Sequence, residues 1–191
     1  NYMKRDYHIP TDFVKYNYVS QLLQARGMQI AIDAHRRAKP YNMGTLYWQL
    51  NDCWPVVSWS SIDYLGNWKA LHYQIKRSFE NQVILTEEKD GVLNFYAVND
   101  ELKKFEDVSL IVYAKKFNGD TIVRRRTDCK KRCLDGILKL ASPKTSFFIS
   151  ESERDNSFLN LVLVDKKGNK IFKILFINLK YFTHHYNSPF L

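Results

Sequence analysis

The sequence predicts two regions of different fold class, an α/β segment over residues 1–80 and an all-β domain over residues 81–191. Up to Phe79, apolar residues recur at helical spacing on both sides of one continuous apolar run. Beyond Phe79, short apolar segments alternate with turns roughly every ten residues. The chain has 191 residues and is 45% hydrophobic, which is sufficient to form a buried core.

The residues before Pro40 predict a long helix. Thr11 suits the N-cap position, and Asp12 suits the first turn, where a negative charge is favourable. One apolar stripe runs along the helix and consists of Val19, Leu22, Leu23 and Ile30. Arg36 and Arg37 suit the negative C-terminal end, and Pro40 ends the helix.

The next two elements are a buried strand and a second helix. Residues 43–50 are mostly apolar or aromatic on both faces, as in a parallel strand that is covered on both sides. Residues 63–67 indicate a turn, with Asn67 as the cap of the following helix. The buried side of that helix is predicted to comprise Trp68, Leu71, His72, Ile75 and Phe79.

Helix, strand, loop and helix form the repeating unit of α/β proteins, but residues 1–80 contain only one strand. A single parallel strand leaves both of its edges unpaired. A complete (β/α)8 TIM barrel needs roughly 250 residues. We therefore interpret residues 1–80 as the last helix-strand-helix segment of such a barrel and expect the rest to lie outside this chain.

Residues 81–191 predict an immunoglobulin-like β-sandwich of about seven strands. Asp90 and Gly91 form a hairpin signal between two of the apolar segments. The Cys-Trp-Cys signature of antibody domains is absent. The candidate strands are VILT, VLNFYAV, VSLIVYAKKF, TIVRRRT, GILKLA, TSFFIS, FLNLVLVD and KIFKILFI.

The net charge of +9 raises nucleic acid as a partner, but the basic residues are dispersed. The densest cluster is Arg124, Arg125, Arg126, Lys130, Lys131 and Arg132. We interpret it as a solvated strand face and predict no nucleic-acid partner. No apolar run approaches the roughly 20 residues of a membrane span, so we predict no membrane partner either.

The cysteines and histidines predict neither a disulfide framework nor a metal site. Cys53, Cys129 and Cys133 are odd in number, and they lack a second Cys/His pair at the spacing of a zinc site. A local disulfide between Cys129 and Cys133 is the minor alternative. His184 and His185 adjoin no carboxylate and are expected at the surface. We predict no metal and no cofactor.

The candidate site lies where the predicted strand ends. Reactive groups of α/β barrels lie at the C-terminal ends of the strands, and Asn51, Asp52 and Trp54 follow this strand directly. An indole can stack on the apolar face of a sugar, while amide and carboxylate groups bind its hydroxyls. Trp48, Asn51, Asp52 and Trp54 therefore predict a sugar-binding site, with core packing as the alternative. Packing is favoured for Trp59 and Trp68.

The run MGTLYWQLNDCWPVVSWSSIDYLGNWKALHY, residues 43–73, resembles the eighth strand, following loop and last helix of the β-mannosidases of glycoside hydrolase family 2. Residues 12–40 are similar to the preceding helix in the same family. The resemblance covers the chain to about Phe79. It implies a retaining exo-glycosidase that hydrolyses terminal β-D-mannose residues from glycans.

The resemblance also implies roles for the site residues. Trp48 corresponds to an aromatic wall for the terminal sugar, Asn51 and Asp52 to an Asn-Asp pair near the pocket, and Trp54 to its entrance. The two catalytic glutamates of the family would precede Asn1. Neither Asp52 nor Asp63 has a glutamate partner suited to this chemistry, so no catalytic residue is assigned in this chain. The chain alone is predicted to be an inactive C-terminal fragment.

Alternatives remain for function and assembly. A sister activity, β-galactosidase or β-glucuronidase, depends mostly on residues outside this chain. A second class is a non-catalytic module in which the β-sandwich binds carbohydrate or another domain. The expected partners are β-mannoside oligosaccharides and the missing N-terminal part of the enzyme. We expect the free chain to form oligomers, or to have a disordered N-terminal region beside a folded sandwich. We expect a periplasmic or secreted location, or a lysosomal one in a eukaryote.

Overall fold

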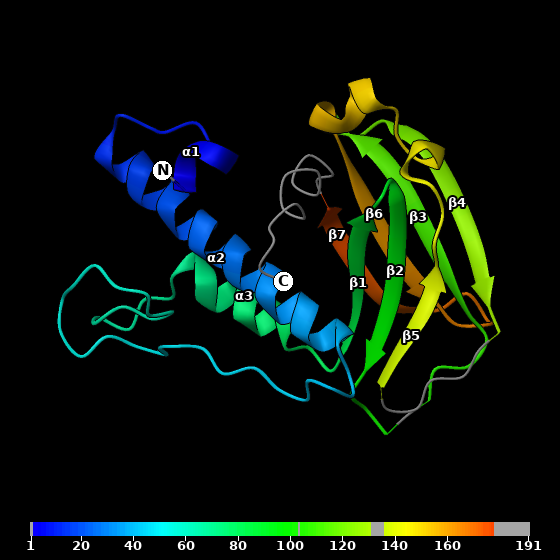
Figure 1. Cartoon of the computed structure of the whole chain (residues 1–191), viewed down its shortest axis with the longest axis horizontal. Coiled ribbons are helices and arrows are strands. Elements are labelled where there is room, and N and C mark those ends of the chain that lie inside the picture. Colours follow the sequence, from blue (N-terminus) through cyan, green and yellow to red (C-terminus); the bar gives the residue numbers. More distant parts are fainter. Residues whose placement is uncertain (1, 103, 131–135, 178–191) are drawn as a thin grey trace. The chain divides into compact units, whose positions relative to one another are not determined.

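The computed structural model describes residues 2–102, 104–130 and 136–177, with side chains as far as residue 172 (Figure 1). The chain divides into two compact units, Asn1–Glu80 and Asn81–Leu191. The first unit contains helices and loops, and the second contains antiparallel sheets. Within the described residues, no helix is long and apolar enough to cross a membrane.

The first unit contains α1 (Tyr2–Asp6), α2 (Phe13–Arg37) and α3 (Ala70–Ser78). The predicted N-cap of α2 is wrong by one residue, because the carboxylate of Asp12 accepts the Lys15 amide at 2.9 Å. A carboxylate caps this end well, since it also opposes the positive end of the helix dipole. The helix ends at Arg37, before Pro40 as predicted.

Helices α2 and α3 lie side by side and run parallel (Figure 1). Near one end, Gln21 Oε1 accepts the Ala70 amide at 3.1 Å, and near the other, Arg36 Nη1 donates to the Ser78 carbonyl. The buried positions of α2 are Ala25, Ile32 and Arg36. The predicted stripe of Val19, Leu22, Leu23 and Ile30 is wrong, since these side chains are only partly buried. The prediction considered only apolar residues, whereas the face of α2 that contacts α3 also uses the polar side chains of Gln21 and Arg36.

The second helix is confirmed, with Leu71 and Ile75 buried against Ile32. The prediction is wrong for Trp68 and Phe79, which flank α3 and are exposed. The predicted cap is also wrong, because α3 begins after Lys69. Asn67 instead closes the preceding turn. Its amide N donates to Asp63 Oδ1 at 2.8 Å, and its Nδ2 donates to Asp63 Oδ2 at 3.0 Å.

Residues 43–50 do not form a regular strand, so this prediction is wrong. A strand needs hydrogen-bonding neighbours, and the described residues supply them only at its end. There, the Ile62 amide donates to the Leu50 carbonyl at 2.8 Å, and Asn51 forms an isolated parallel bridge with Ile62. The segment is nevertheless extended, and its side chains alternate in burial.

The described part of the second unit contains seven strands in two antiparallel sheets. The three-stranded sheet has the order β1 (Gln82–Lys89), β2 (Val92–Asn99), β5 (Gly136–Ala141). The four-stranded sheet has the order β4 (Thr121–Cys129), β3 (Val108–Lys116), β6 (Ser157–Val164), β7 (Lys170–Ile177). The predicted count of about seven strands is confirmed.

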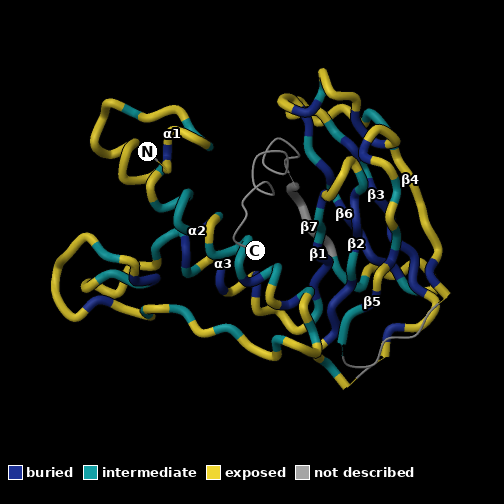
Figure 2. Tube along the Cα trace, viewed as in Figure 1, coloured by how far each residue is buried: buried dark blue, intermediate teal, exposed yellow. Residues whose placement is uncertain are grey.

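One predicted strand is wrong, because TSFFIS forms the short 3-10 helix η1 (Thr145–Phe147) and a buried turn. Phe148 and Ile149 enter the core between the two sheets, where the Phe148 ring meets Phe95 edge to face at 6.0 Å. The second 3-10 helix, η2 (Glu151–Asn156), follows. Figure 2 shows the buried positions concentrated along the strands, whereas the loop after α2 is largely exposed.

Candidate functional site

The extended segment after α2 presents two different faces. Thr45, Tyr47 and Gln49 are half-buried, and Tyr47 packs on the cluster of Ile32, Leu71 and Ile75. The intervening side chains are exposed, with Leu46 at 100% and Trp48 at 74%. In an extended chain, alternate side chains point to opposite sides. Trp48 therefore lies on the face directed away from the helices.

Polar side chains fasten the half-buried face to the helices. His35 Nδ1 lies 2.9 Å from Thr45 Oγ1. The Tyr47 hydroxyl lies 3.0 Å from Ser61 Oγ, which is also 3.0 Å from His72 Nδ1. Ser61 is fully buried, so its pairing with His72 serves packing and not nucleophilic chemistry. These contacts fix the orientation of the segment, including the side on which Trp48 lies. The Trp48–Gln49 peptide bond is cis.

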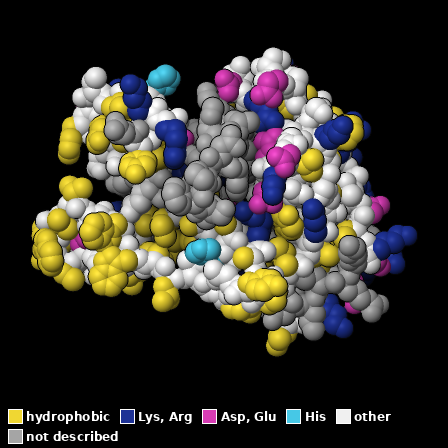
Figure 3. Space-filling view, in the orientation of Figure 1, with side chains coloured by type: hydrophobic (Ala, Val, Ile, Leu, Met, Phe, Trp, Pro, Cys, Tyr) yellow, Lys and Arg dark blue, Asp and Glu magenta, His cyan; other side chains and the backbone are white. Residues whose placement is uncertain are grey.

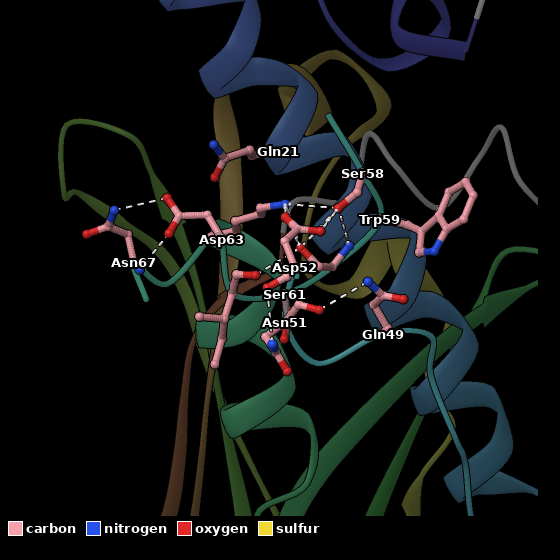
Figure 4. Close-up of polar contacts among 12 residues, drawn as sticks. Gln21, Gln49, Asn51, Asp52, Ser58, Trp59, Ser61, Asp63 and Asn67 are labelled. Carbon is pink, nitrogen blue, oxygen red and sulfur yellow. Dashed lines mark hydrogen bonds and ion pairs between the residues drawn. The ribbon is translucent and has the colours of Figure 1, made fainter. Parts of the chain in front are cut away.

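Asp52 is buried in a polar cluster directly after this segment (Figure 4). Ser58 Oγ donates to Asp52 Oδ1 at 2.5 Å, and Ser60 Oγ donates to Asp52 Oδ2 at 2.7 Å. Lys69 Nζ forms an ion pair with Asp52 Oδ2 at 3.1 Å and also donates to Ser60 Oγ at 2.7 Å. We call these four residues the Asp52 cluster.

The electrostatics of the cluster favour an ionised Asp52. The hydrogen bond from Ser58, followed by those from Ser60 and Lys69, holds the pKa of the Asp52 carboxyl below its usual value of 3.8. Burial opposes this shift. Asp52 is thus a charged, hydrogen-bonded group at neutral pH, and both of its oxygens are occupied by residues of this chain.

Asn51 and Trp54 lie on either side of Asp52 and are exposed. Asn51 Nδ2 donates to the Asp52 carbonyl at 3.2 Å, and its own carbonyl accepts Gln49 Nε2 at 3.0 Å. Trp54 is 64% exposed on the loop of residues 53–57. Trp48, Asn51 and Trp54 therefore remain accessible, whereas the Asp52 side chain turns into the protein. Their roles toward a sugar stay predictions.

The two tryptophans assigned to packing differ. Trp68 contacts His72 with 4.3 Å between ring centroids and Tyr73 with 5.1 Å. Trp59 is 63% exposed, so the packing expected for it is not found in this chain. Figure 4 shows its ring directed away from the Asp52 cluster, while the Trp59 carbonyl accepts Gln24 Nε2 at 2.8 Å. Hydrophobic side chains gather over the loop after α2 (Figure 3, lower left).

A hollow of about 470 Å³ lies beside α2 and α3, and its lining includes Tyr7, Tyr18, Arg26, Trp68 and Tyr73. Tyr7 is half-buried here, whereas the neighbouring His8 is exposed. Among the residues that the structure describes, the lining contains no aspartate or glutamate. The described lining therefore does not supply the paired carboxyl groups that glycoside hydrolysis requires.

Sequence reasoning missed Ser58, Ser60 and Lys69. Two serines at alternate positions and a lysine after a turn do not form a recognisable sequence motif by themselves. The only hint in the sequence was the position of Lys69 directly before a helix. A positive charge is unfavourable there because it faces the positive end of the helix dipole, so some other interaction must stabilise the lysine. The stabilising interaction of Lys69 is its ion pair with Asp52.

The described residues contain no group of three or more His, Cys, Asp and Glu side chains that could hold a metal ion. Cys53 is exposed, and Cys129 is a free thiol in the core of the second unit. Cys133, His184 and His185 lie outside the described residues.

No protein-family model matches the chain. Among curated proteins, it is similar to the β-mannosidase of Capra hircus, with 40% identity over 90 residues that cover 44% of this chain and 10% of that protein. It is also similar to β-mannosidase A of Aspergillus flavus, with 33% identity over 110 residues, or 51% of this chain and 12% of that protein. The matches thus span only about a tenth of these relatives.

Among solved structures, the β-D-mannosidase of Dictyoglomus thermophilum superposes with a TM-score of 0.71 and 27% identity, covering 93% of this chain and 21% of that one. An exo-chitosanase of Amycolatopsis orientalis gives 0.69 at 14% identity, covering 92% and 20%, which indicates a shared fold. The chain therefore shares its order of helices followed by two antiparallel sheets with part of each of these two enzymes. More specifically, the chain is similar in sequence and fold to part of a β-mannosidase, and the predicted resemblance to β-mannosidases is confirmed.

Proposed function

We propose that this chain is the C-terminal part of a retaining exo-glycosidase that hydrolyses terminal β-D-mannose residues from glycans. In this proposal, residues 1–80 complete a (β/α)8 catalytic barrel, and residues 81–191 form an immunoglobulin-like sandwich. The parallel α2 and α3, joined by an extended segment, support the first assignment. Two sheets of three and four strands support the second.

The observation that carries the proposal is the position of Trp48. Its ring is exposed on the face opposite the helices, and in a closed barrel that face is directed inward. Trp48 also lies near the end of the extended segment, where barrel enzymes bind their substrates. An indole there can stack on the apolar face of the terminal mannose.

The catalytic carboxyl groups belong to residues outside this chain in our proposal. Retaining hydrolysis uses two carboxyl groups roughly 5 Å apart, one as acid/base and one as nucleophile. Among described carboxylates near Trp48, Asp52 is engaged by Ser58 and Lys69, and Asp63 is engaged by Asn67. Neither carboxylate is available as acid/base or nucleophile, which supports the proposal that the isolated chain is inactive. The catalytic partner is the remainder of the same enzyme, acting on secreted, periplasmic or lysosomal glycans.

The test uses the whole enzyme containing this chain, with aryl β-mannoside, β-galactoside and β-glucuronide as substrates. We expect turnover of the mannoside by the whole enzyme and none by the chain alone. W48A should lower kcat/KM about 100-fold or more, as misplacement of a bound sugar does. Y64A, which removes another exposed ring on the turn of residues 63–67, is the matched control and should stay near wild type.

Three outcomes would contradict the proposal. Hydrolysis by the chain alone would show that its carboxylates suffice. Preference for the galactoside or glucuronide would assign a sister activity. Binding of manno-oligosaccharides by residues 81–191, without turnover by the whole enzyme, would favour the non-catalytic module.

A further inference from the structure

The loop of residues 53–57 is an exposed apolar projection between two polar anchors. Trp54 is 64% exposed and Val57 is fully exposed. The residue before the loop, Asp52, and the residue after it, Ser58, are joined by the 2.5 Å hydrogen bond. Exposed apolar side chains of this kind are typical of a surface that meets a partner or ligand.

The base of this loop is more strongly fixed than its tip. The side chains of Asp52 and Lys69 are 1% and 14% exposed, and their ion pair is shielded from solvent. The Asp52 amide also donates to the Ile62 carbonyl at 3.1 Å, and the Lys69 amide donates to the Ser61 carbonyl at 2.9 Å. Because Lys69 directly precedes α3, these contacts tie the loop to that helix.

Removal of either charge leaves the other buried without compensation. Such a loss is costly, whereas removal of both charges together is much less so. A loop with a fixed base also loses less conformational entropy when a ligand orders it. The Asp52 cluster therefore has the properties of a device that sets the position of a binding loop before the ligand arrives.

We propose that the Asp52–Lys69 pair is a positioning device that holds Trp54 against the sugar next to the terminal mannose, on the leaving-group side. This inference rests on the proposed function. Trp48 precedes the end of the extended segment, whereas Trp54 follows it, so Trp54 lies farther from the barrel centre and meets a more distant part of the glycan. Asp52 acts only through the loop, because Ser58, Ser60 and Lys69 occupy its oxygens.

The experiment compares KM and kcat of the whole enzyme on two substrates, an aryl β-mannoside and a β-1,4-linked mannotriose. We expect D52N and W54A to raise KM for mannotriose about tenfold, which corresponds to about 1.4 kcal/mol. KM for the aryl mannoside should rise by a clearly smaller factor than KM for mannotriose, since its leaving group is not a sugar. K69M should resemble D52N, and K69R should restore most of the affinity.

A double-mutant cycle tests the pairing itself. D52N with K69M should raise KM less than the product of the two single effects, because the double variant buries no unpaired charge. The matched control is D63N, which alters another hydrogen-bonded aspartate in the same unit. Its carboxylate accepts hydrogen bonds from Asn67, and Lys69 acts on it only through the weaker effect of a nearby charge. D63N should leave both KM values near wild type.

The outcomes separate the two proposals. An active wild-type enzyme in which D52N behaves like D63N would overturn the inference alone. Equal losses of kcat on both substrates with unchanged KM would reduce the cluster to a folding role and overturn it as well. An inactive wild-type enzyme would overturn the proposed function, and this inference with it.

Discussion

Arg154 and Glu88 form a bidentate ion pair inside the second unit. Arg154 Nη2 lies 2.6 Å from Glu88 Oε1, and Nη1 lies 3.0 Å from Oε2. The Thr145 hydroxyl adds a third bond, donating to Glu88 Oε1 at 2.6 Å. The pair thus connects β1 to both 3-10 helices, η1 and η2.

E88Q should destabilise the chain by about 3 kcal/mol, because the Arg154 charge loses its buried partner and keeps the exposed Glu151. Equilibrium urea unfolding measures the change. The matched control is E151Q, since Glu151 contacts the same arginine at 2.8 Å but its side chain is 83% exposed. Exposed ion pairs contribute roughly 0–1 kcal/mol. Equal effects of the two variants would contradict the importance of burial.

The stability contributed by Asp52 should depend on pH in a defined direction. Its pKa in the folded chain is lower than the usual 3.8 because Ser58, Ser60 and Lys69 bind the carboxylate. A lowered pKa stabilises the fold above the unfolded value, and the contribution disappears as pH falls through the folded value. The difference in melting temperature between wild type and D52N should therefore be largest near neutral pH and shrink below 3.8. A constant difference between pH 7 and pH 3 would contradict this assignment.

Phe148 should be the more important of two adjacent phenylalanines. Phe148 is buried between the sheets, whereas Phe147 on the same short turn is exposed. F148A should lower the free energy of unfolding by about 3–5 kcal/mol, since it leaves a cavity against Phe95. F147A should change it by less than about 0.5 kcal/mol. Urea unfolding followed by tryptophan fluorescence or circular dichroism distinguishes them.

The exposed apolar side chains of the first unit should make the isolated chain associate. Leu46 and Val57 are fully exposed, and other hydrophobic side chains adjoin them along the same loop. Sedimentation velocity should detect larger species as concentration rises. Replacing both residues by serine should shift the distribution toward monomer, while K4S, a change of an exposed charged residue on α1, should not. A monodisperse wild-type monomer would contradict this prediction.

Local patterns predicted most of the second unit, because antiparallel strands carry their signal in short apolar segments with turns between them. TSFFIS has the same composition but is not a strand. Its Thr145 amide donates to the Gly91 carbonyl, and its Phe148 enters the core. Such long-range contacts decide the conformation and leave no periodic pattern in the sequence.

The first unit was harder to predict for the same reason. The face of α2 that meets α3 uses Gln21 and Arg36, which a search for apolar stripes passes over. Residues 43–50 are strand-like in sequence but lack a ladder of neighbours in the described residues. At the site, the exposure of Trp48 follows from the alternation of side chains along an extended segment. The ion pair of Asp52 depends on Lys69, which lies beyond the turn of residues 63–67 and could not be predicted from local sequence.

The separation of anchor and tip in the loop after Asp52 has an evolutionary consequence. The hydrogen bonds at its base come from Asp52, Ser58, Ser60 and Lys69, and not from residues 53–57. Substitutions at residues 53–57 can therefore accumulate without disturbing the hydrogen bonds of the Asp52 cluster. We therefore expect that exchanging these few solvent-facing side chains would change what the loop binds while the architecture stays intact.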